Sequence, residues 1–232
     1  MILIVASRAD DGAGRLSMEL PRGSSVILTP LDLSRPGWRV NGRETSDSIA
    51  VAGGRTLESR GITGVVCLLP RVFAKELGHI KAEDRAYVAD EMTAFLVFWL
   101  SSLDCPKLNS PTPGCLSGPI WSRERWLLEA ASAGLPVTTL RRSTRAAADA
   151  ECSSERHVTV TVTGRSCLGH EDPQLRERAR RLASAAGVDL LSVQFRTDDT
   201  VGGFAGADQF PDVSQPGVAE AIWDFFQDAG RA

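Results

Sequence analysis

The stretch Met1-Ile-Leu-Ile-Val-Ala6 is apolar throughout and rich in residues that favour β-strands. It is short and has no basic leader, so it predicts a first buried strand rather than a signal peptide. Other short runs rich in Val, Ile and Leu alternate with stretches of helical periodicity. This alternation predicts an α/β fold with a mainly parallel N-terminal sheet flanked by helices. The predicted strands are Ile2–Ala6, Ser25–Thr29, Thr63–Leu69, Pro136–Leu140, His157–Thr163, Asp189–Phe195 and Val201–Ala207.

Four helices are expected between and after these strands. The longest, Ala82–Leu103, carries large apolar side chains at helical spacing. The helix Ser122–Ala133 is followed by Gly134 and Pro136, which are typical of a helix end. The other two helices are expected over Asp172–Ala186 and Pro216–Gln227.

The charge and the apolar runs of the chain exclude several classes of protein. A net charge of −3 argues against a general affinity for nucleic acid or for anionic membranes. The longest apolar run, Phe95–Leu100, is too short to cross a bilayer. Five cysteines at irregular spacing are typical of reduced thiols, so we expect a cytoplasmic protein.

A change of character at Arg141–Arg156 predicts a domain boundary. This stretch is polar, rich in Ala, Ser and Arg, and has no strand pattern. It is followed by His157-Val-Thr-Val-Thr-Val-Thr163, whose alternation predicts a half-buried strand. We therefore expect an α/β domain over residues 1–142, a linker over 143–156 and a small α+β domain over 157–232.

Two regions of the chain resemble a known family. Asp84–Trp99 and Cys105–Pro119, with the unusual loop Leu108-Asn-Ser-Pro-Thr-Pro-Gly-Cys115, resemble the N-terminal portion of ATP-grasp-like proteins from actinobacterial natural-product gene clusters. The C-terminal stretch Ala179–Asp212 ends in Gly203-Phe-Ala-Gly-Ala-Asp-Gln-Phe-Pro-Asp212 and is similar to the closing strands of an ATP-grasp fold. The resemblance implies a pre-ATP-grasp domain followed by a remnant of an ATP-grasp domain.

The chain departs from this family where the nucleotide chemistry would lie. Complete ATP-grasp ligases hold ATP between two antiparallel sheets, with lysines on the phosphates and magnesium-binding acids on the closing strands. Here no lysine follows Lys107, and only the sixteen residues Arg141–Arg156 stand in place of a nucleotide-binding subdomain. The positions expected to carry acids are Gln194 and Gly206, which leaves Asp208 alone. The resemblance therefore implies a truncated protein with a degenerate site and no cofactor.

Two functions follow from this resemblance. The first is ATP-independent acyl transfer, cyclisation or hydrolysis of an amino-acid or peptide-like natural-product intermediate. The second is a non-catalytic partner or scaffold subunit of a full-length ATP-grasp ligase. We expect a homodimer or a complex with a partner biosynthetic enzyme, with the apolar helix Val88–Leu103 as the interface in the second case.

The Asn109–Ser117 loop is a candidate site because it follows a short strand and is rich in Pro and Gly. Open α/β folds bind ligands where the strands end, so the loop is expected to present polar side chains there. A structural crossover loop is the alternative. The catalytic candidates are Asp208, Cys115 and Glu91, the last as a pocket carboxylate or as a surface glutamate. The expected substrate-binding residues are Asn109, Ser110, Thr112, Ser117, Gln194, Arg196 and Asp212.

A group of two cysteines and two histidines forms a further candidate. Cys152, His157, Cys167 and His170 lie within nineteen residues, and both residue types bind zinc. Their overall spacing matches no zinc finger, so isolated residues are the main expectation and no metal is predicted. A zinc hydrolase and a Cys–His nucleophilic pair are the alternatives.

Overall fold

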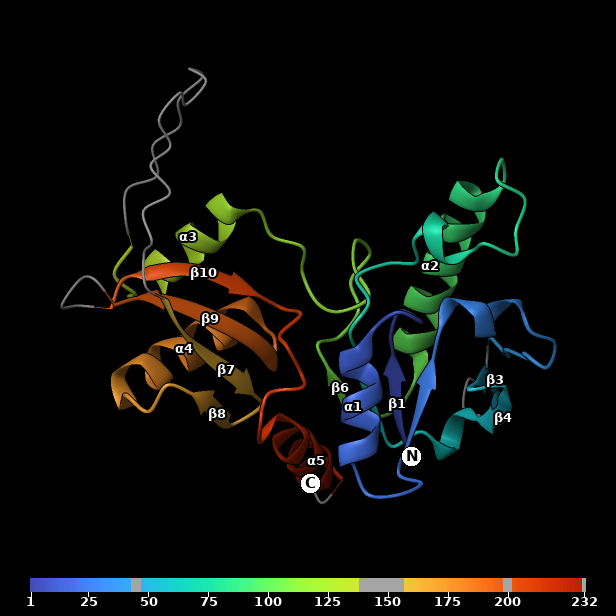
Figure 1. The fold of residues 1–232 in the computed structure, drawn as a ribbon, viewed down its shortest axis with the longest axis horizontal. Helices are drawn as coiled ribbons and strands as arrows, with labels where there is room; N and C mark the ends of the chain where they lie inside the picture. Colours follow the sequence, from blue (N-terminus) through green and yellow to red (C-terminus); the bar gives the residue numbers. More distant parts are fainter. Residues whose placement is uncertain (43–46, 138–156, 198–201, 231–232) are drawn as a thin grey trace. The chain divides into compact units, whose positions relative to one another are not determined.

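The computed structural model describes residues 1–42, 47–137, 157–197 and 202–230 (Figure 1). By its internal contacts the chain divides into two compact units. The first unit combines Met1–Ile120 with Asp212–Ala232, and the second unit is Trp121–Pro211. The linker expected over residues 143–156 lies outside the described residues. Helix α3 (Arg123–Ser132), which precedes this segment, belongs to the second unit. Helix α5 (Val218–Ala229), the last helix of the chain, belongs to the first unit.

The first unit is built on a four-stranded sheet in the order β2-β1-β5-β6. All three pairings in it are parallel, which confirms the mainly parallel N-terminal sheet. All four residues of β1 and all four of β5 are buried, as parallel strands covered on both faces require. The strands are β1 (Ile2–Val5), β2 (Ser25–Leu28), β5 (Gly64–Cys67) and β6 (Lys107–Leu108).

Three helices cover this sheet. The long helix α2 (Arg85–Ser102) buries Trp99 in one core cluster with Leu3 and Val65. Side chains alternate along a strand, so Gly64 presents the opposite face from its neighbour Val65, and the ring of Phe226 packs against it there. Phe226 belongs to α5 (Val218–Ala229), which contacts α1 (Asp11–Glu19) (Figure 1). The sheet is therefore buried between α2 and the α1–α5 pair.

A small hairpin of β3 (Ile49–Ala52) and β4 (Arg55–Glu58) completes the first unit and was not predicted from the sequence. Gly53 and Gly54 connect its strands, and both have positive φ angles, +57° and +72°. Such a two-glycine connection is a common hairpin signal. Because the side chains of β4 are mostly exposed, the strand lacks the apolar run that marks a buried strand.

The second unit is an antiparallel sheet in the order β10-β9-β7-β8. Its strands are β7 (His157–Thr163), β8 (Ser166–Gly169), β9 (Leu190–Arg196) and β10 (Phe204–Asp208). In this sheet β10 pairs antiparallel with β9, the strand that precedes it along the chain. Helix α4 (Pro173–Ala186) packs against β7 and β9, and α3 (Arg123–Ser132) packs against β10. Gly187, with φ +64°, ends α4 where the sequence indicated an end.

The two faces of the second sheet differ in chemistry. Val160 and Val193 belong to the core that the two helices cover. The alternating positions on the other face are polar, and there the hydroxyls of Thr161 and Ser192 lie 2.9 Å apart in a buried hydrogen bond. Within the described ranges, no helix is long and apolar enough to cross a membrane.

Candidate functional site

The carboxyl edge of the parallel sheet is the natural place for a ligand in the first unit. The chain runs from β1 to β2 on one side and then returns to β5 on the other side of β1. Where strand order reverses in this way, the connecting loops diverge and leave a crevice outside the carboxyl ends of the strands. The structure has an open pocket at this edge.

This edge pocket has a volume of about 780 Å³. It is bounded by the segment after β1, by the first half of α1 and by the segment after β2. Three arginines enter its lining, together with carboxylates, hydroxyls and a few apolar side chains. The charged and hydroxyl residues of the lining are Ser7, Arg8, Asp10, Asp11, Arg15, Thr29, Asp32 and Arg35.

Asp32 is the most constrained carboxylate of the edge pocket. It is only 4% exposed and lies in the 3-10 helix η1 (Pro30–Ser34). Its Oδ2 accepts hydrogen bonds from the backbone N–H and the hydroxyl of Thr29, at 3.0 and 2.9 Å. Its Oδ1 accepts one from Gly54 N at 3.1 Å and lies 3.7 Å from a guanidinium nitrogen of Arg35. Asp32 therefore ties η1 to the β3–β4 turn and shapes the pocket wall.

The N-terminus of α1 forms another wall of the pocket. Asp10 caps this helix, and its Oδ1 accepts a hydrogen bond from Ala13 N at 3.0 Å. Arg15, one turn further along α1, also lines the pocket and acts electrostatically on Asp212. Hydrogen bonds from Ser214 lower the pKa of Asp212, and the charge of Arg15 lowers it further. Asp212, a predicted substrate-binding residue, is thus exposed in the turn before α5 and within the electrostatic reach of this pocket.

The Asn109–Ser117 loop follows β6, as the sequence analysis expected, but it is held largely by its own hydrogen bonds. Thr112 Oγ1 donates to Gly118 O at 3.0 Å, and Leu116 N donates to Pro70 O at 2.9 Å. Asn109 is buried in a left-handed conformation with φ +62°. Cys115 and Ser117 are completely buried, and Ser117 N donates to Cys115 Sγ at 3.4 Å. Ser110 is exposed.

The remaining predicted residues of the second unit come together on the polar face of its sheet. Gly206 lies directly opposite Gln194, and Asp208 lies opposite Ser192. Both Gln194 and Asp208 are exposed, and Asp208 Oδ1 accepts a hydrogen bond from Phe210 N at 2.9 Å. Arg196 is partly buried at the end of β9. The structure therefore places the three family-derived positions on one face, with one carboxylate among them.

Two other predicted sites lie apart from the edge pocket. Glu91 is on the exposed side of α2 and does not line the edge pocket. His157 begins β7, Cys167 lies in β8 and His170 follows it. Among the described residues, no group of three or more His, Cys, Asp or Glu side chains is arranged to hold a metal ion. Cys152 falls outside those residues.

The arginines of the edge pocket were not predicted from the sequence. Arg8 and Arg15 occur singly, and neither is part of a motif. The available signal was their position, because polar residues directly after a buried first strand lie at the carboxyl edge of the sheet. The pocket forms only because the segment after β2 lies beside these two arginines in the folded chain.

The geometry can be compared with known proteins. The chain matches no family model and no curated protein. Among solved structures, it is similar to the macrocyclase MdnC of Microcystis aeruginosa, determined with its precursor peptide MdnA, with a TM-score of 0.71 and 12% identity. The similarity covers 98% of this chain and 99% of MdnC. The chain has an ATP-grasp-like fold, because it shares this architecture with solved ATP-grasp proteins as well.

Two further structures share this ATP-grasp-like fold. An ATP-grasp ligase of Chryseobacterium gregarium, solved with ADP and a leader and core peptide, has a TM-score of 0.70 at 11% identity. The similarity covers 98% of this chain and 96% of that ligase. A RimK-domain ATP-grasp protein of Sphaerobacter thermophilus has a TM-score of 0.52 at 14% identity, over 97% of this chain and 99% of that protein. At these identities the similarity establishes the fold alone.

Proposed function

We propose that this chain is a biosynthetic protein that binds a peptide-like natural-product intermediate. The observation that carries this proposal is the ATP-grasp-like fold, shared over nearly the whole chain with two peptide-bound proteins. Both of those proteins were determined with peptides, a macrocyclase with its precursor and a ligase with a leader and core peptide. A protein that retains this fold retains a framework suited to holding an extended peptide.

The edge pocket is the proposed contact surface in the first unit. Its arginines can bind carboxylates and backbone carbonyls, while Asp10 and Asp11 can accept peptide N–H groups. Apolar side chains, among them Ile27 and Leu31, line the same pocket and suit the apolar parts of a peptide. The predicted contacts that are exposed, Ser110, Gln194, Asp208 and Asp212, stay part of the proposal.

The proposed reaction does not use conventional ATP-dependent ligation. All three lysines of the chain, Lys75, Lys81 and Lys107, lie in the first unit, and the closing strands carry Gln194 and Gly206 where the family places acids. A triphosphate with magnesium needs several cationic donors and carboxylates around it. We therefore propose an ATP-grasp-like protein with a degenerate nucleotide site that performs ATP-independent acyl transfer, cyclisation or hydrolysis.

Titration calorimetry with ATP and magnesium tests the nucleotide part of the proposal. We expect no saturable heat with the full-length chain, and a folded ATP-grasp ligase serves as the positive control. Clear saturable binding of ATP would contradict the degenerate site, while leaving peptide binding open.

A peptide selection tests the binding part. A pool of synthetic random peptides is incubated with the immobilised full-length chain, and retained sequences are resynthesised and titrated by fluorescence anisotropy. Arg15→Ala is expected to weaken their binding about tenfold, because one charge-assisted hydrogen bond is lost. Arg22→Ala is the matched control, since Arg22 is exposed and does not line the pocket. Retention of no peptide, or equal binding to both variants, would count against the proposal.

One observation favours the second candidate, a non-catalytic partner protein. Tyr87 and Phe98 are 68% and 50% exposed on α2, and their spacing places them on one face of the helix. Exposed aromatic side chains are typical of protein interfaces. Sedimentation of the wild-type chain and of Phe98→Ser measures whether this face holds two copies together. Leu128→Ser, at an exposed apolar position of α3, is the control.

A further inference from the structure

A second pocket lies at the point where strand order reverses in the first unit. Its walls come from Arg8 after β1, from Pro30 and Leu31 after β2, and from Lys75, Glu76 and His79 after β5. Loops from three neighbouring parallel strands therefore meet around it. This reversal-point pocket, of about 370 Å³, shares Arg8 and Leu31 with the edge pocket.

Glu76 is the residue that makes the pocket unusual. Its Oε2 is buried and has no hydrogen-bond partner among the described residues. Leaving a buried carboxylate oxygen without a donor is unfavourable, because its lost hydration is not replaced by a hydrogen bond. In the described part of the chain, Glu76 also forms no ion pair with either cation of the pocket. Glu76 as a whole is partly exposed and lines the pocket, so its unpaired carboxylate is available to a ligand there.

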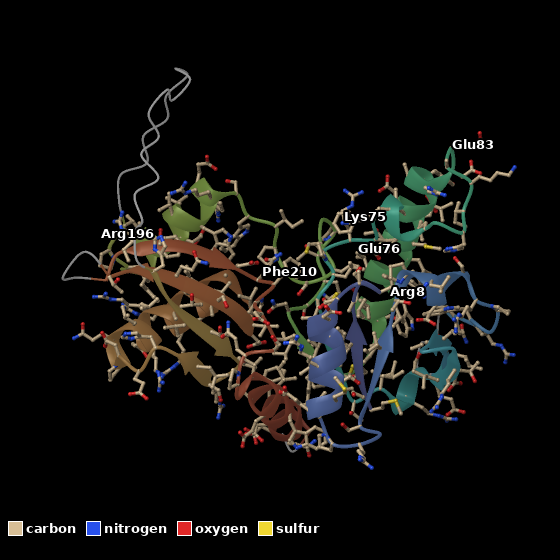
Figure 2. The ribbon with its side chains drawn as sticks, in the orientation of Figure 1. Arg8, Lys75, Glu76, Glu83, Arg196 and Phe210 are labelled. Atoms are coloured by element: carbon tan, nitrogen blue, oxygen red, sulfur yellow. The ribbon has the colours of Figure 1, made fainter. Side chains whose placement is uncertain are left out.

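Two cationic side chains line the same pocket. Arg8 and Lys75 both line it and are exposed, and Figure 2 shows them on the same part of the first unit as Glu76. The ammonium of Lys75 lies 5.4 Å from the centre of the Phe73 ring, which orients it without neutralising it. Neither cation forms an ion pair in the described part of the chain, so both are available to an anion.

The pocket is also held in shape by its own residues. His79 Nε2 and Ser34 Oγ are 2.8 Å apart in a hydrogen bond, which joins the segment after β5 to η1. Pro30 is buried and Leu31 is partly buried, so this wall is apolar. The site thus combines one acceptor, two cations and an apolar wall.

We infer that the reversal-point pocket binds a free α-amino acid as its zwitterion. The α-ammonium donates to Glu76, and the α-carboxylate pairs with Arg8 and Lys75. A ligand with a carboxylate alone leaves the Glu76 oxygen unsatisfied, and a ligand with an amine alone is repelled by the two cations. A volume of about 370 Å³ is at the small end for ligand pockets, which suits one amino acid rather than a peptide.

This inference goes beyond the proposed peptide role, because it assigns a small-molecule site to a second pocket. Arg8 lines both pockets and cannot separate them. Glu76 and Lys75 line the reversal-point pocket and not the edge pocket, so their substitution distinguishes amino-acid binding from peptide binding.

Calorimetry on the full-length chain tests the inference with the twenty common L-amino acids, each at millimolar concentration. At least one is expected to bind saturably. The N-acetyl derivative and the C-terminal amide of that amino acid each lack one charge, and each is expected to bind at least about tenfold more weakly. Absence of binding across the panel, or equal binding of either derivative, would overturn the inference.

Two pairs of variants locate the site. Glu76→Gln keeps the shape of the side chain and is expected to weaken binding about tenfold or more, whereas Glu83→Gln, at an exposed position outside the pocket, is expected to leave it unchanged. Lys75→Met is compared with Lys81→Met in the same way, and a thermal melt checks that each variant folds. Unchanged affinity in both pocket variants would assign the binding to another place and sink the inference. Peptide binding that persists in Glu76→Gln separates this site from the proposed function.

Discussion

The sheets of the two units are covered by helices in different ways. In the first unit a parallel sheet is covered by α2 on one face and by the α1–α5 pair on the other. In the second unit α3 and α4 cover one face of an antiparallel sheet, and the alternate face carries Thr161, Ser192 and Gln194. A sheet that is covered on both faces leaves only its edge for ligands, and both pockets lie at the carboxyl edge of the first sheet. The polar face of the second sheet is buried at Thr161 and Ser192 and exposed at Gln194.

The largest expected loss of stability comes from a substitution in α2, one of the helices that cover the first sheet. Trp99 is completely buried, and its ring packs edge-on against Trp38 at a centroid distance of 5.1 Å. Trp99→Ala is expected to destabilise the first unit by about 3–5 kcal/mol through lost burial and a cavity. Hydrogen exchange of the amides of each unit measures the effect separately. Phe98→Ala, at the neighbouring exposed position of α2, is the control, and a similar loss in both variants would contradict the assigned burial.

A paired glycine substitution sharpens the contrast between the tightly packed face of the first sheet and the polar face of the second sheet. A methyl group on Gly64 would overlap the ring of Phe226, so Gly64→Ala is expected to cost about 1–3 kcal/mol by overpacking. A methyl group on Gly206 meets only the side-chain oxygen of Gln194 at 3.5 Å, so Gly206→Ala is expected to stay within about 0.5 kcal/mol of wild type. Urea unfolding measures both. Equal costs would mean that the two faces are packed alike.

Each unit contains a buried hydrogen-bonded polar group, which is charged in the first unit (Asp32) and neutral in the second (Thr161 with Ser192). Substitutions can compare their contributions to stability. Asp32→Asn replaces one accepting oxygen of Asp32 with an amide donor that faces Gly54 N–H or the Thr29 donors, which is expected to cost about 1–3 kcal/mol. Thr161→Val in the second unit removes one neutral hydrogen bond to Ser192 and is expected to cost about 1 kcal/mol. Hydrogen exchange in each unit compares the two losses. An Asp32→Asn loss below that of Thr161→Val would contradict the structural role of this carboxylate.

The smallest expected effect concerns two aspartates whose contributions to the stability of the protein depend on pH with opposite sign. The pKa of Asp212 is lowered by hydrogen bonds from Ser214, so its contribution to stability is present above the ordinary pKa of about 4 and is lost as pH falls through its folded pKa. Burial raises the pKa of Asp189, so its folded form holds the proton longer and its unfavourable contribution appears as pH rises above about 4.

Thermal melts of two asparagine variants between neutral and acid pH measure this difference. Asp212→Asn is expected to lower the melting temperature at neutral pH and not in acid. The corresponding loss in free energy of unfolding is at most about 1 kcal/mol, because the carboxylate is exposed. Asp189→Asn is expected to raise the melting temperature slightly, and only at neutral pH. The same sign in both variants would contradict these environments.

Much of the fold could be predicted from local pattern. The strand His157–Thr163 was predicted with its observed ends, because its strict alternation indicates a strand directly. The expected half-burial was wrong, because Thr161 and Thr163 on the polar face are buried as well. Helix α2 was expected a few residues too long at its start, which is where helix ends are least defined. The β3–β4 hairpin was missed because its outer strand is exposed and has no apolar run.

The candidate sites were less accessible to sequence reasoning. Family resemblance indicated Gln194, Gly206 and Asp208, and the structure places them on one face because strand pairing sets adjacent positions opposite each other. The residues of the reversal-point pocket are far apart in sequence and belong to no motif, so only strand order brings Arg8 beside Lys75 and Glu76.

The sequence alone determined most of the buried strands, the four longest helices and the parallel N-terminal sheet, because these follow from periodicity and from the spacing of apolar side chains. Only the tertiary structure decided that α5 returns to the first unit, that both faces of that sheet are covered, and that its carboxyl edge holds two pockets. The physical reason is that side-chain burial and the partners of isolated charged groups depend on contacts between distant segments, which local pattern does not record.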